Sequence, residues 1–367
     1  MELDRGMRHV DRLMRQAISA TVFPGGRLLV SHAGRILFNE AYGLANIYTG
    51  QPVTVDTVFD LASLTKPLAT TLAVMGLIQD GKLHIDQRLS SIISDFSNTP
   101  KANIQIRHLL YHTAGLPDYR PYYIDISQLS IEHRKDALRE KLISEPLIST
   151  IGKQTRYSDI GFMILEWVIE RLSGTGLNDF VQKKIYDPMG LENLFFIVHD
   201  QYIPKKNYAA TELCPWRQIL LNGRVHDDNA YVMGGVAGHA GLFGTAESVH
   251  AIVLELLKSF HGNPSVHTFQ PDLVRSFFHK PDKNGRVLGF DVPSPIGSSC
   301  GELFDRDVTV GHLGFTGTSF WMDLAQQVIV ILLTNRVHPS RNNEQIKKFR
   351  PIIHNQVMKR FRTLSIL

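Results

Sequence analysis

Cysteine is nearly absent from this sequence of 367 residues, which contains only Cys214 and Cys300. Two cysteines cannot make the disulfide framework of a small secreted domain, and these two do not have the spacing of a metal-binding pair. We therefore expect two independent thiols. Stability must come from an apolar core, which a chain of this length with 43% hydrophobic residues can supply.

The sequence also lacks a long apolar run and a large excess of charge of one sign. No run reaches the roughly 18 residues of a membrane span, and residues 1–18 mix both charges with an apolar helical stripe, unlike a secretory signal. The net charge of +4, from 39 basic and 35 acidic residues, is spread along the chain. We expect no membrane span, no nucleic-acid partner and a cytoplasmic location, or a periplasmic one if a signal peptide was removed. The sequence does not indicate an oligomeric state.

Strand-like segments lie near both ends of the chain, and helical patterns fill the middle. The predicted strands cover residues 27–32 and 36–42, joined by a hairpin turn at Ala33-Gly34-Arg35, and residues 318–323 and 327–335. The predicted helices cover residues 1–18, 64–78, 104–111, 131–144, 160–172, 246–260 and 343–361. This pattern predicts an α+β fold with one sheet assembled from the two termini and flanked by helices.

We predict a single catalytic domain over residues 1–367. Its α/β region comprises residues 1–80 plus 285–367, and a mainly helical region, residues 81–284, is inserted between them. A functional site is expected in the cleft between these two regions.

The first candidate for chemistry is Ser63-Leu64-Thr65-Lys66. A serine and a lysine three residues apart lie on one face of a helix, close enough for the amine to reach the hydroxyl. Pro67 is tolerated only in a first helical turn, so we expect the helix to begin near Ser63, with free N–H groups that can stabilise an oxyanion. Lys66 can act as the base if burial lowers its pKa. The motif alone is weak, because Ser-x-x-Lys occurs by chance in chains of this size.

Two further segments are candidates. In Tyr157-Ser158-Asp159, a tyrosine held partly as phenolate by a nearby ammonium can shuttle protons; alternatively Tyr157 is an ordinary half-buried aromatic and Asp159 an N-cap. The glycine-rich segment 311–317 has N–H groups that can complete an oxyanion hole, worth about 2.7–4 kcal/mol per donor. It can equally be a plain loop before a strand.

Taken in order, Ser-x-x-Lys at residues 63–66, Tyr-x-Asp at 157–159 and His-x-Gly at 312–314 resemble the three-motif signature of class C β-lactamases and the related penicillin-binding peptidases, D-aminopeptidases and esterases. Segments 59–63, 107–116 and 238–243 agree with this resemblance, which runs from about residue 20 to 340. It implies the antiparallel sheet of that transpeptidase-like fold.

The resemblance also implies a role for each motif residue. Ser63 is the nucleophile that forms an acyl-enzyme, and Lys66 and Tyr157 share the proton transfers. The oxyanion hole consists of the backbone N–H groups of Ser63 and Phe315. Asp159, His312 and Gly314 bind substrate, and neither a metal nor an organic cofactor is needed.

Two residues depart from the pattern. Asp159 stands where many relatives have asparagine. An ionised carboxylate cannot donate a hydrogen bond to substrate. It also favours a charged Lys66, which shifts the base role toward Tyr157. His312 replaces the usual lysine and is expected to be mostly neutral at pH 7. We therefore expect inefficient hydrolysis of penicillins and of D-alanyl-D-alanine, whereas esterase-like and D-aminopeptidase-like relatives tolerate such a change.

The resulting prediction is a serine hydrolase that acts on a small-molecule or short-peptide ester, amide or D-amino-acid-containing substrate. A class C-type β-lactamase or D,D-peptidase with a protonated His312 is one alternative, and a non-catalytic peptidoglycan sensor is another.

Several other polar residues lie near these motifs in the sequence. His108 and His112 have zinc-like spacing without an intervening glutamate, so we interpret them as structural. His226-Asp227-Asp228 is interpreted as a loop that borders the cleft. For Asp118 and Tyr119, a place in the site and a plain loop remain equally open.

Overall fold

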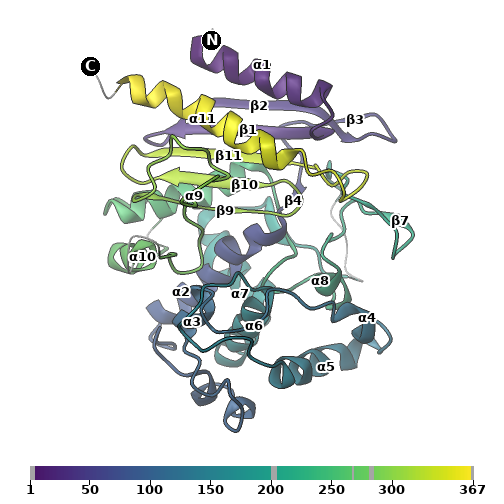
Figure 1. The fold of residues 1–367 in the computed structure, drawn as a ribbon, viewed down its shortest axis with the longest axis vertical. Helices are drawn as coiled ribbons and strands as arrows, with labels where there is room; N and C mark the ends of the chain where they lie inside the picture. The colour runs from purple at the N-terminus through teal and green to yellow at the C-terminus, as the bar shows by residue number, and fades with distance from the viewer. Residues whose placement is uncertain (1–4, 200–204, 267, 281–284, 365–367) are drawn as a thin grey trace.

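The computed structural model describes residues 5–199, 205–266, 268–280 and 285–364. Its main element is a six-stranded antiparallel sheet in the order β3-β2-β1-β11-β10-β9 (Figure 1). The sheet joins the two ends of the chain because β1 pairs with β11 along its length. The strands are β1 (Gly25–His32), β2 (Arg35–Asn46), β3 (Gln51–Pro52), β9 (Thr309–Leu313), β10 (Ser319–Asp323) and β11 (Val328–Thr334).

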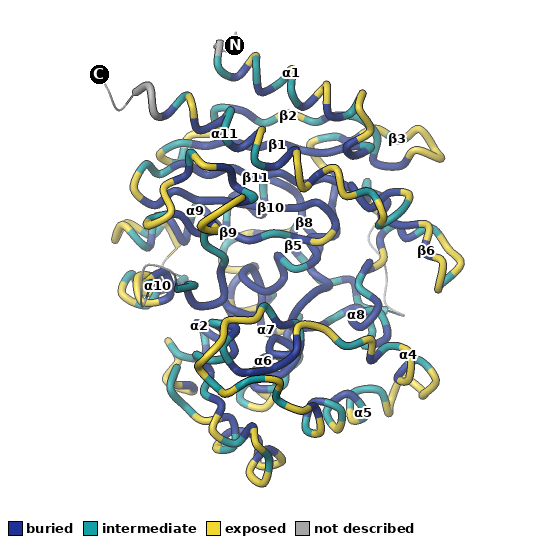
Figure 2. Tube along the Cα trace, in the orientation of Figure 1, coloured by how far each residue is buried: buried dark blue, intermediate teal, exposed yellow. Residues whose placement is uncertain are grey.

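The sheet is covered on both faces, which explains the nearly continuous apolar sequence of its central strand β11. On β11, Ile329, Ile331 and Leu333 join the large core toward the helical region, whereas Val328, Val330 and Leu332 join a second core. The second core lies under α1 (Arg5–Ser19) and α11 (Ile346–Leu364), which pack against each other on the outer face (Figure 1). In Figure 2 the central strands are accordingly buried along most of their length. The alternation follows from the two-residue period of a strand.

Helices dominate the rest of the chain. The α9 helix (Ala246–Phe260) packs on β1 and β11, although it falls within the range predicted as the inserted helical region; that division of the chain stays a prediction. The other helices are α2 (Leu72–Gln79), α3 (Ile106–Leu110), α4 (Tyr123–Ile126), α5 (Ile131–Ser144), α6 (Asp159–Ser173), α7 (Leu177–Val181), α8 (Asp228–Val232) and α10 (Pro271–Phe278). The small sheets comprise β4 (Phe59–Asp60), β8 (Leu242–Gly244) and β5 (Leu194–Phe196), and β6 (Leu213–Cys214) with β7 (Ile219–Leu220).

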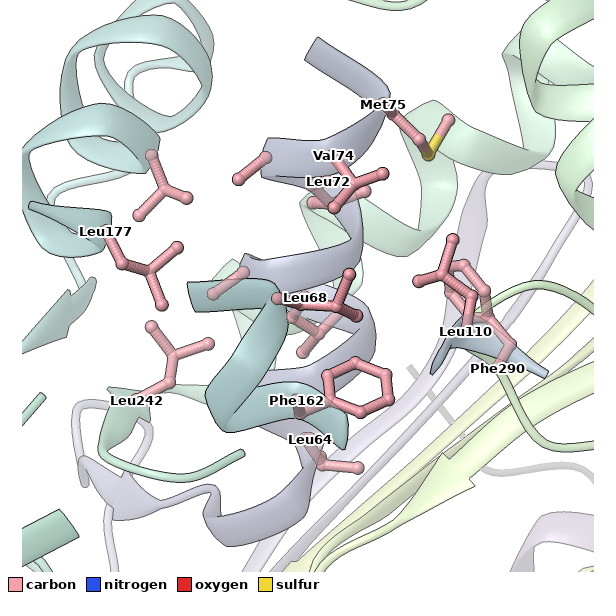
Figure 3. Packing of buried hydrophobic residues seen from close by; sticks show 14 of the residues in the cluster. Leu64, Leu68, Leu72, Val74, Met75, Leu110, Phe162, Leu177, Leu242 and Phe290 are labelled. Atoms are coloured by element: carbon pink, nitrogen blue, oxygen red, sulfur yellow. The ribbon is translucent and has the colours of Figure 1, made fainter. Parts of the chain in front are cut away.

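The segment after Ser63 is helical as predicted, but its first turns are not α-helical. Ala62–Leu64 forms a 3₁₀ turn and Lys66–Thr71 a π-helical turn before α2 begins at Leu72. Pro67 lies in the first turn of the π-helical segment, where its missing N–H costs no hydrogen bond. Figure 3 shows Leu64, Leu68 and Leu72 of this segment packed among buried side chains of other elements. The nucleophile candidate therefore sits on a firmly packed segment.

The α+β class, the antiparallel sheet from both termini and the flanking helices are confirmed. The main difference lies in segment 311–317, where β9 includes His312 and Leu313 and only the following residues form a loop. No helix within the described ranges is long and apolar enough to cross a membrane.

Candidate active site

Ser63 follows a sharp, strained turn that projects it from β4. Ala62 has a φ of +48°, a left-handed conformation that costs a non-glycine residue about 1–3 kcal/mol. The carboxylate of Asp60 holds this turn, because it accepts hydrogen bonds from the N–H of Ala62 at 2.8 Å and from the N–H of His226 at 2.6 Å. The Asp60 carboxylate thus ties the strained turn before Ser63 to the segment that contains His226.

The Lys66 ammonium is fully buried and lies beside three oxygen atoms. Its Nζ is 3.1 Å from Ser63 Oγ and 3.2 Å from the backbone oxygen of His239, and it forms an ion pair with Asp159 Oδ1 at 2.7 Å. An opposite charge this close favours the charged form of a lysine. The geometry therefore fits a protonated Lys66.

The electrostatic surroundings of Lys66 lead to the same conclusion. Burial alone would lower the pKa of Lys66, but the charge of Asp159, the nearby Tyr157 and hydrogen bonds to both raise that pKa above its ordinary value. The condition under which Lys66 would act as the base, a pKa lowered by burial, is not met, because the Asp159 carboxylate outweighs desolvation. The predicted consequence of having Asp159 in place of asparagine is borne out by this shift.

Tyr157 is fixed beside the other two motif residues by aromatic neighbours. Its ring centroid lies 4.7 Å from that of His112 and 5.9 Å from that of His312, and Lys66 Nζ is 4.7 Å from it. Burial raises the pKa of Tyr157 above its ordinary value, while Lys66 and hydrogen bonds to Lys66 and Ser63 oppose this rise. The neutral hydroxyl is therefore favoured in Tyr157, and a phenolate depends on stabilisation by Lys66.

The backbone around Tyr157 is held by neighbouring loops. The N–H of Ser158 donates to His112 Nδ1 at 3.0 Å, and the N–H of Asp159 donates to the backbone oxygen of Asp118 at 2.9 Å. The N-cap of α6 is Ser158, whose hydroxyl oxygen accepts from the N–H of Gly161 at 3.2 Å, and not Asp159 as one alternative held. Asp159 is thereby free to pair with Lys66.

The candidate oxyanion hole joins the turn at Ser63 to the loop that follows β9. The loop is tied to the residues before Ser63, since Thr316 donates to the backbone oxygen of Asp60 at 2.7 Å and Thr318 to that of Leu61 at 3.0 Å. Outside helices and strands, no backbone acceptor is found for the N–H of Phe315 among the described residues, and Ser63 and Phe315 line one cavity. Two backbone donors held beside one cavity are what a developing oxyanion needs.

His312 and Gly314 lie at the same edge of the sheet. His312 is 1% exposed, and burial, its largest influence, lowers its pKa to about 4. Its Nδ1 lies 2.8 Å from the backbone oxygen of Leu313, so in the neutral ring Nδ1 is the donor. The expectation of a neutral His312 holds, and the alternative of a protonated His312 is disfavoured.

An acidic cavity of about 370 Å³ opens on one side of Ser63, lined by Tyr119, Asp159 and the segment His226-Asp227-Asp228 among others. Tyr119 therefore lies in the site, and the 226–228 segment borders the cleft as predicted. Asp227 Oδ1 pairs with His239 Nε2 at 3.0 Å, and this charge raises the pKa of His239 against the opposing effect of burial. The side chain of His239 was not singled out from the sequence, where it stands only in a glycine-rich segment.

A second cavity of about 510 Å³ also includes Ser63, and it is rich in cations. Arg286 pairs with Asp291 and Lys347 with Glu344. Two further cationic residues that line it are Arg336 and Arg350. Sequence reasoning did not identify these four cationic residues as part of the site, because they come from distant segments and share no motif.

Other predicted features take structural places. Both cysteines are buried and free, as expected. His108 Nδ1 accepts from the N–H of Gln105 at 3.0 Å, and His112 holds the loop of Tyr157, which agrees with a structural role for the pair. Among the described residues no group of three or more histidine, cysteine, aspartate or glutamate side chains is arranged to hold a metal ion.

Comparison with known proteins identifies the family that has this fold and these motifs. The family model described as Beta-lactamase matches residues 10–350. The chain belongs to the β-lactamase family. A curated relative of this β-lactamase-family hydrolase, a putative D-alanyl-D-alanine carboxypeptidase of Escherichia coli O157:H7, is 31% identical over 365 residues, which cover 90% of this chain and 82% of the relative. An N-acetylmuramyl-L-alanine amidase of Bacillus subtilis strain 168 is 30% identical over 361 residues, with 90% and 81% covered.

Solved structures agree with the fold of the β-lactamase family. EstCE1, a hydrolase with promiscuous acyltransferase activity, matches with a TM-score of 0.72 and 23% identity, covering 94% of this chain and 98% of EstCE1. At that identity the likeness shows the fold alone. Together with the sequence relatives, it identifies the chain as a β-lactamase-family serine hydrolase.

Proposed function

We propose that the protein is an acyl-serine hydrolase in which Ser63 attacks the carbonyl carbon of a small ester, amide or D-amino-acid-containing substrate. The observation that carries the proposal is the environment of the Ser63 hydroxyl. Lys66 Nζ lies 3.1 Å from its oxygen, and the hydroxyl of Tyr157 interacts with both groups. A serine needs such proton-transfer partners to act as a nucleophile.

The protonation states favour Tyr157 as the base. Lys66 keeps its proton because of Asp159, so the reactive form arises when Tyr157 loses its proton to solvent and its phenolate is stabilised by the ammonium. As Ser63 Oγ bonds to the carbonyl carbon, the hydroxyl proton moves to Tyr157. The negative charge on the carbonyl oxygen is then stabilised by the N–H groups of Ser63 and Phe315.

Acylation ends when Tyr157 gives its proton to the leaving group as the bond to that group breaks, which leaves an ester on Ser63. The second half of the reaction repeats these proton transfers with water. A water molecule then passes a proton to Tyr157 and attacks the acyl carbon. The Ser63–acyl bond breaks, Ser63 recovers the proton from Tyr157, and the carboxylic acid leaves.

A D,D-peptidase is the second candidate, and the cationic cavity favours it. His312 does not supply the charge that a lysine gives other family members, but Arg286, Arg336 and Arg350 line the cavity that includes Ser63. Guanidinium groups bind a carboxylate well, and the relative of Escherichia coli carries the name of a D-alanyl-D-alanine carboxypeptidase. A substrate with a free carboxylate next to the scissile bond fits this side of the cleft.

Substrate preference separates these candidates. The purified protein is incubated with p-nitrophenyl acetate, with a fluorescent penicillin and with a peptide ending in D-alanyl-D-alanine, each beside Ser63→Ala, and both turnover and intact mass are recorded. Ester turnover lost in Ser63→Ala, with little penicillin adduct, supports the esterase-like hydrolase. Ser63-dependent release of D-alanine or a penicillin adduct supports the peptidase. A stable adduct without turnover supports the sensor, and ester turnover that persists in Ser63→Ala contradicts the proposal.

A further inference from the structure

Two arginines, Arg350 on α11 and Arg336 in the turn after β11, hold the loop between β9 and β10, which carries the N–H of Phe315. Arg350, on α11, donates through Nη2 to the backbone oxygen of Gly314 at 3.1 Å and to that of Thr318 at 2.9 Å. Arg336 donates through Nε to the backbone oxygen of Phe315 at 2.8 Å. The two guanidinium groups therefore bind consecutive peptide units of one loop.

Arg350 is unusual because its charge is buried without a carboxylate. It is 7% exposed, and among the described residues the only charged group that influences it is Arg336. Burial first, and then the charge of Arg336, lower the pKa of Arg350 to about 10, so the group stays charged at neutral pH. A buried cation that is not paired is costly, and here its charge is directed at backbone carbonyl oxygens.

The carbonyl of Gly314 and the N–H of Phe315 belong to the same peptide unit. Resonance couples the two ends of that unit, so a cation bonded to the oxygen draws electron density from the nitrogen and makes the N–H a stronger donor. Outside helices and strands, no backbone acceptor is found for this N–H among the described residues, and it belongs to the oxyanion hole proposed above. Arg350 thus bonds to one end of a peptide unit whose other end belongs to Phe315, which lines the cavity beside Ser63.

We propose that Arg350 is a positioning residue that polarises and orients the Gly314–Phe315 peptide, and so strengthens the oxyanion hole. The inference rests on the proposed function for its catalytic consequence, but the polarisation itself does not require turnover. The backbone around Gly314 is held tightly enough for this effect, because its N–H donates to the backbone oxygen of Thr318 at 2.7 Å and its oxygen accepts from the N–H of Gly317 at 3.1 Å.

Arg336 provides a comparison at a neighbouring peptide unit, and its Nη1 also donates to the backbone oxygens of Arg341 and Asn343, both at 2.9 Å. It binds the carbonyl of the next peptide unit, whose N–H belongs to Thr316 and not to the oxyanion hole. Its guanidinium carbon also lies 4.4 Å from the ring centroid of Phe315. If the arginines only anchor the loop, Arg336→Gln and Arg350→Gln have similar effects; if Arg350 polarises the donor, the two variants differ.

The first test measures the Phe315 amide in the resting enzyme. The protein is labelled with ¹⁵N-phenylalanine, and the Phe315 signal is assigned with Phe315→Tyr. We expect the amide proton resonance to move upfield in Arg350→Gln, to return toward the wild-type position in Arg350→Lys and to stay in place in Arg336→Gln. An unmoved resonance in Arg350→Gln, or an equal movement in Arg336→Gln, overturns the proposal. Arg350→Lys keeps the test informative if Arg350→Gln does not fold.

The second test measures the catalytic consequence in folded enzyme counted by active-site titration. A strengthening of 10–30% in a donor of this kind predicts that kcat falls about two- to eightfold in Arg350→Gln, with KM unchanged. The carbonyl stretch of a ¹³C-labelled acyl group on Ser63 should move to higher wavenumber in the same variant and not in Arg336→Gln. Wild-type kcat and an unmoved stretch in Arg350→Gln overturn the catalytic part of the proposal. If wild-type enzyme forms no Ser63 adduct while the amide resonance still responds to Arg350, the proposed function fails and the polarisation stands.

Discussion

Asp159→Asn should move the pH dependence of catalysis to lower pH. Asp159 holds the proton on Lys66 and also raises the pKa of Tyr157 by its charge. Without that charge, the Tyr157 phenolate is less opposed, so Tyr157 loses its proton at lower pH. The effect requires Lys66 to stay protonated, because its ammonium stabilises the phenolate.

The size of the effect follows from the ion pair. Charges separated by 2.7 Å interact by about 6 kcal/mol at an effective dielectric constant near 20. Asparagine keeps an oxygen that accepts from Lys66, and the Asp159 side chain is 17% exposed, so solvent offsets part of that loss. We expect the profile to move by about 1–3 pH units, the range typical of an opposite charge this close. If pH 7 lies on the rising limb of the profile, each pH unit of this shift raises kcat/KM at pH 7 about tenfold.

The assay is kcat/KM for p-nitrophenyl butyrate from about pH 6 to 9, corrected for buffer hydrolysis. Wild-type activity should rise across this range without a plateau, because the pKa of Tyr157 lies above its ordinary value. Asp159→Glu retains the charge and serves as the control, with a profile close to that of the wild type. A profile of Asp159→Asn that stays in place, or moves to higher pH, refutes the assignment of the protonation states.

Three further substitutions test separate parts of the site. Tyr157→Phe keeps the ring between His112 and His312 but removes the hydroxyl, so kcat should fall about 10²–10⁴-fold with an unchanged melting temperature; near-wild-type kcat contradicts the base role. Gly314→Ala places a Cβ against Thr318 Oγ1 and 2.6 Å from the backbone oxygen of Leu61. The free energy of unfolding measured in urea should therefore fall by about 1–3 kcal/mol, and kcat should fall as well. An unchanged stability would mean that the loop is not tightly packed. Ala62→Gly relieves the left-handed turn and should raise the free energy of unfolding by up to about 1 kcal/mol; a loss of stability would contradict the strain.

Local signals account for the elements that sequence reasoning predicts well. The boundaries of α5 and α9 agree with the predicted ranges because their signals are local; α9, for example, begins after Thr245, whose side chain accepts from the N–H of Ser248. The β1–β2 hairpin was predictable from its turn, where Ala33 and Gly34 both have positive φ. In contrast, the strand β9 looks like the start of a loop because Gly311 is followed closely by Gly314 and Gly317, and its pairing with β10 makes it a strand.

The chemical state of the site depends on distances that a sequence does not contain. The motif order brought Ser63, Lys66 and Tyr157 together correctly, but the balance between burial and the charge of Asp159 decides whether Lys66 is protonated, and that balance needs the 2.7 Å contact. The cationic side of the cleft was invisible for a similar reason. Arg286, Arg336 and Arg350 meet only after α11 and the segment before β9 pack around the sheet edge.

The central claim, that Ser63 forms an acyl-enzyme, is tested most directly by locating the covalent intermediate. The protein is treated with a slowly released ester such as p-nitrophenyl pivalate, quenched in acid, and examined by intact mass and peptide mapping beside Ser63→Ala. We predict one added acyl group on the peptide that contains Ser63, and none in Ser63→Ala. An acyl group on another residue, or an equal adduct in Ser63→Ala, would contradict the assignment of the nucleophile.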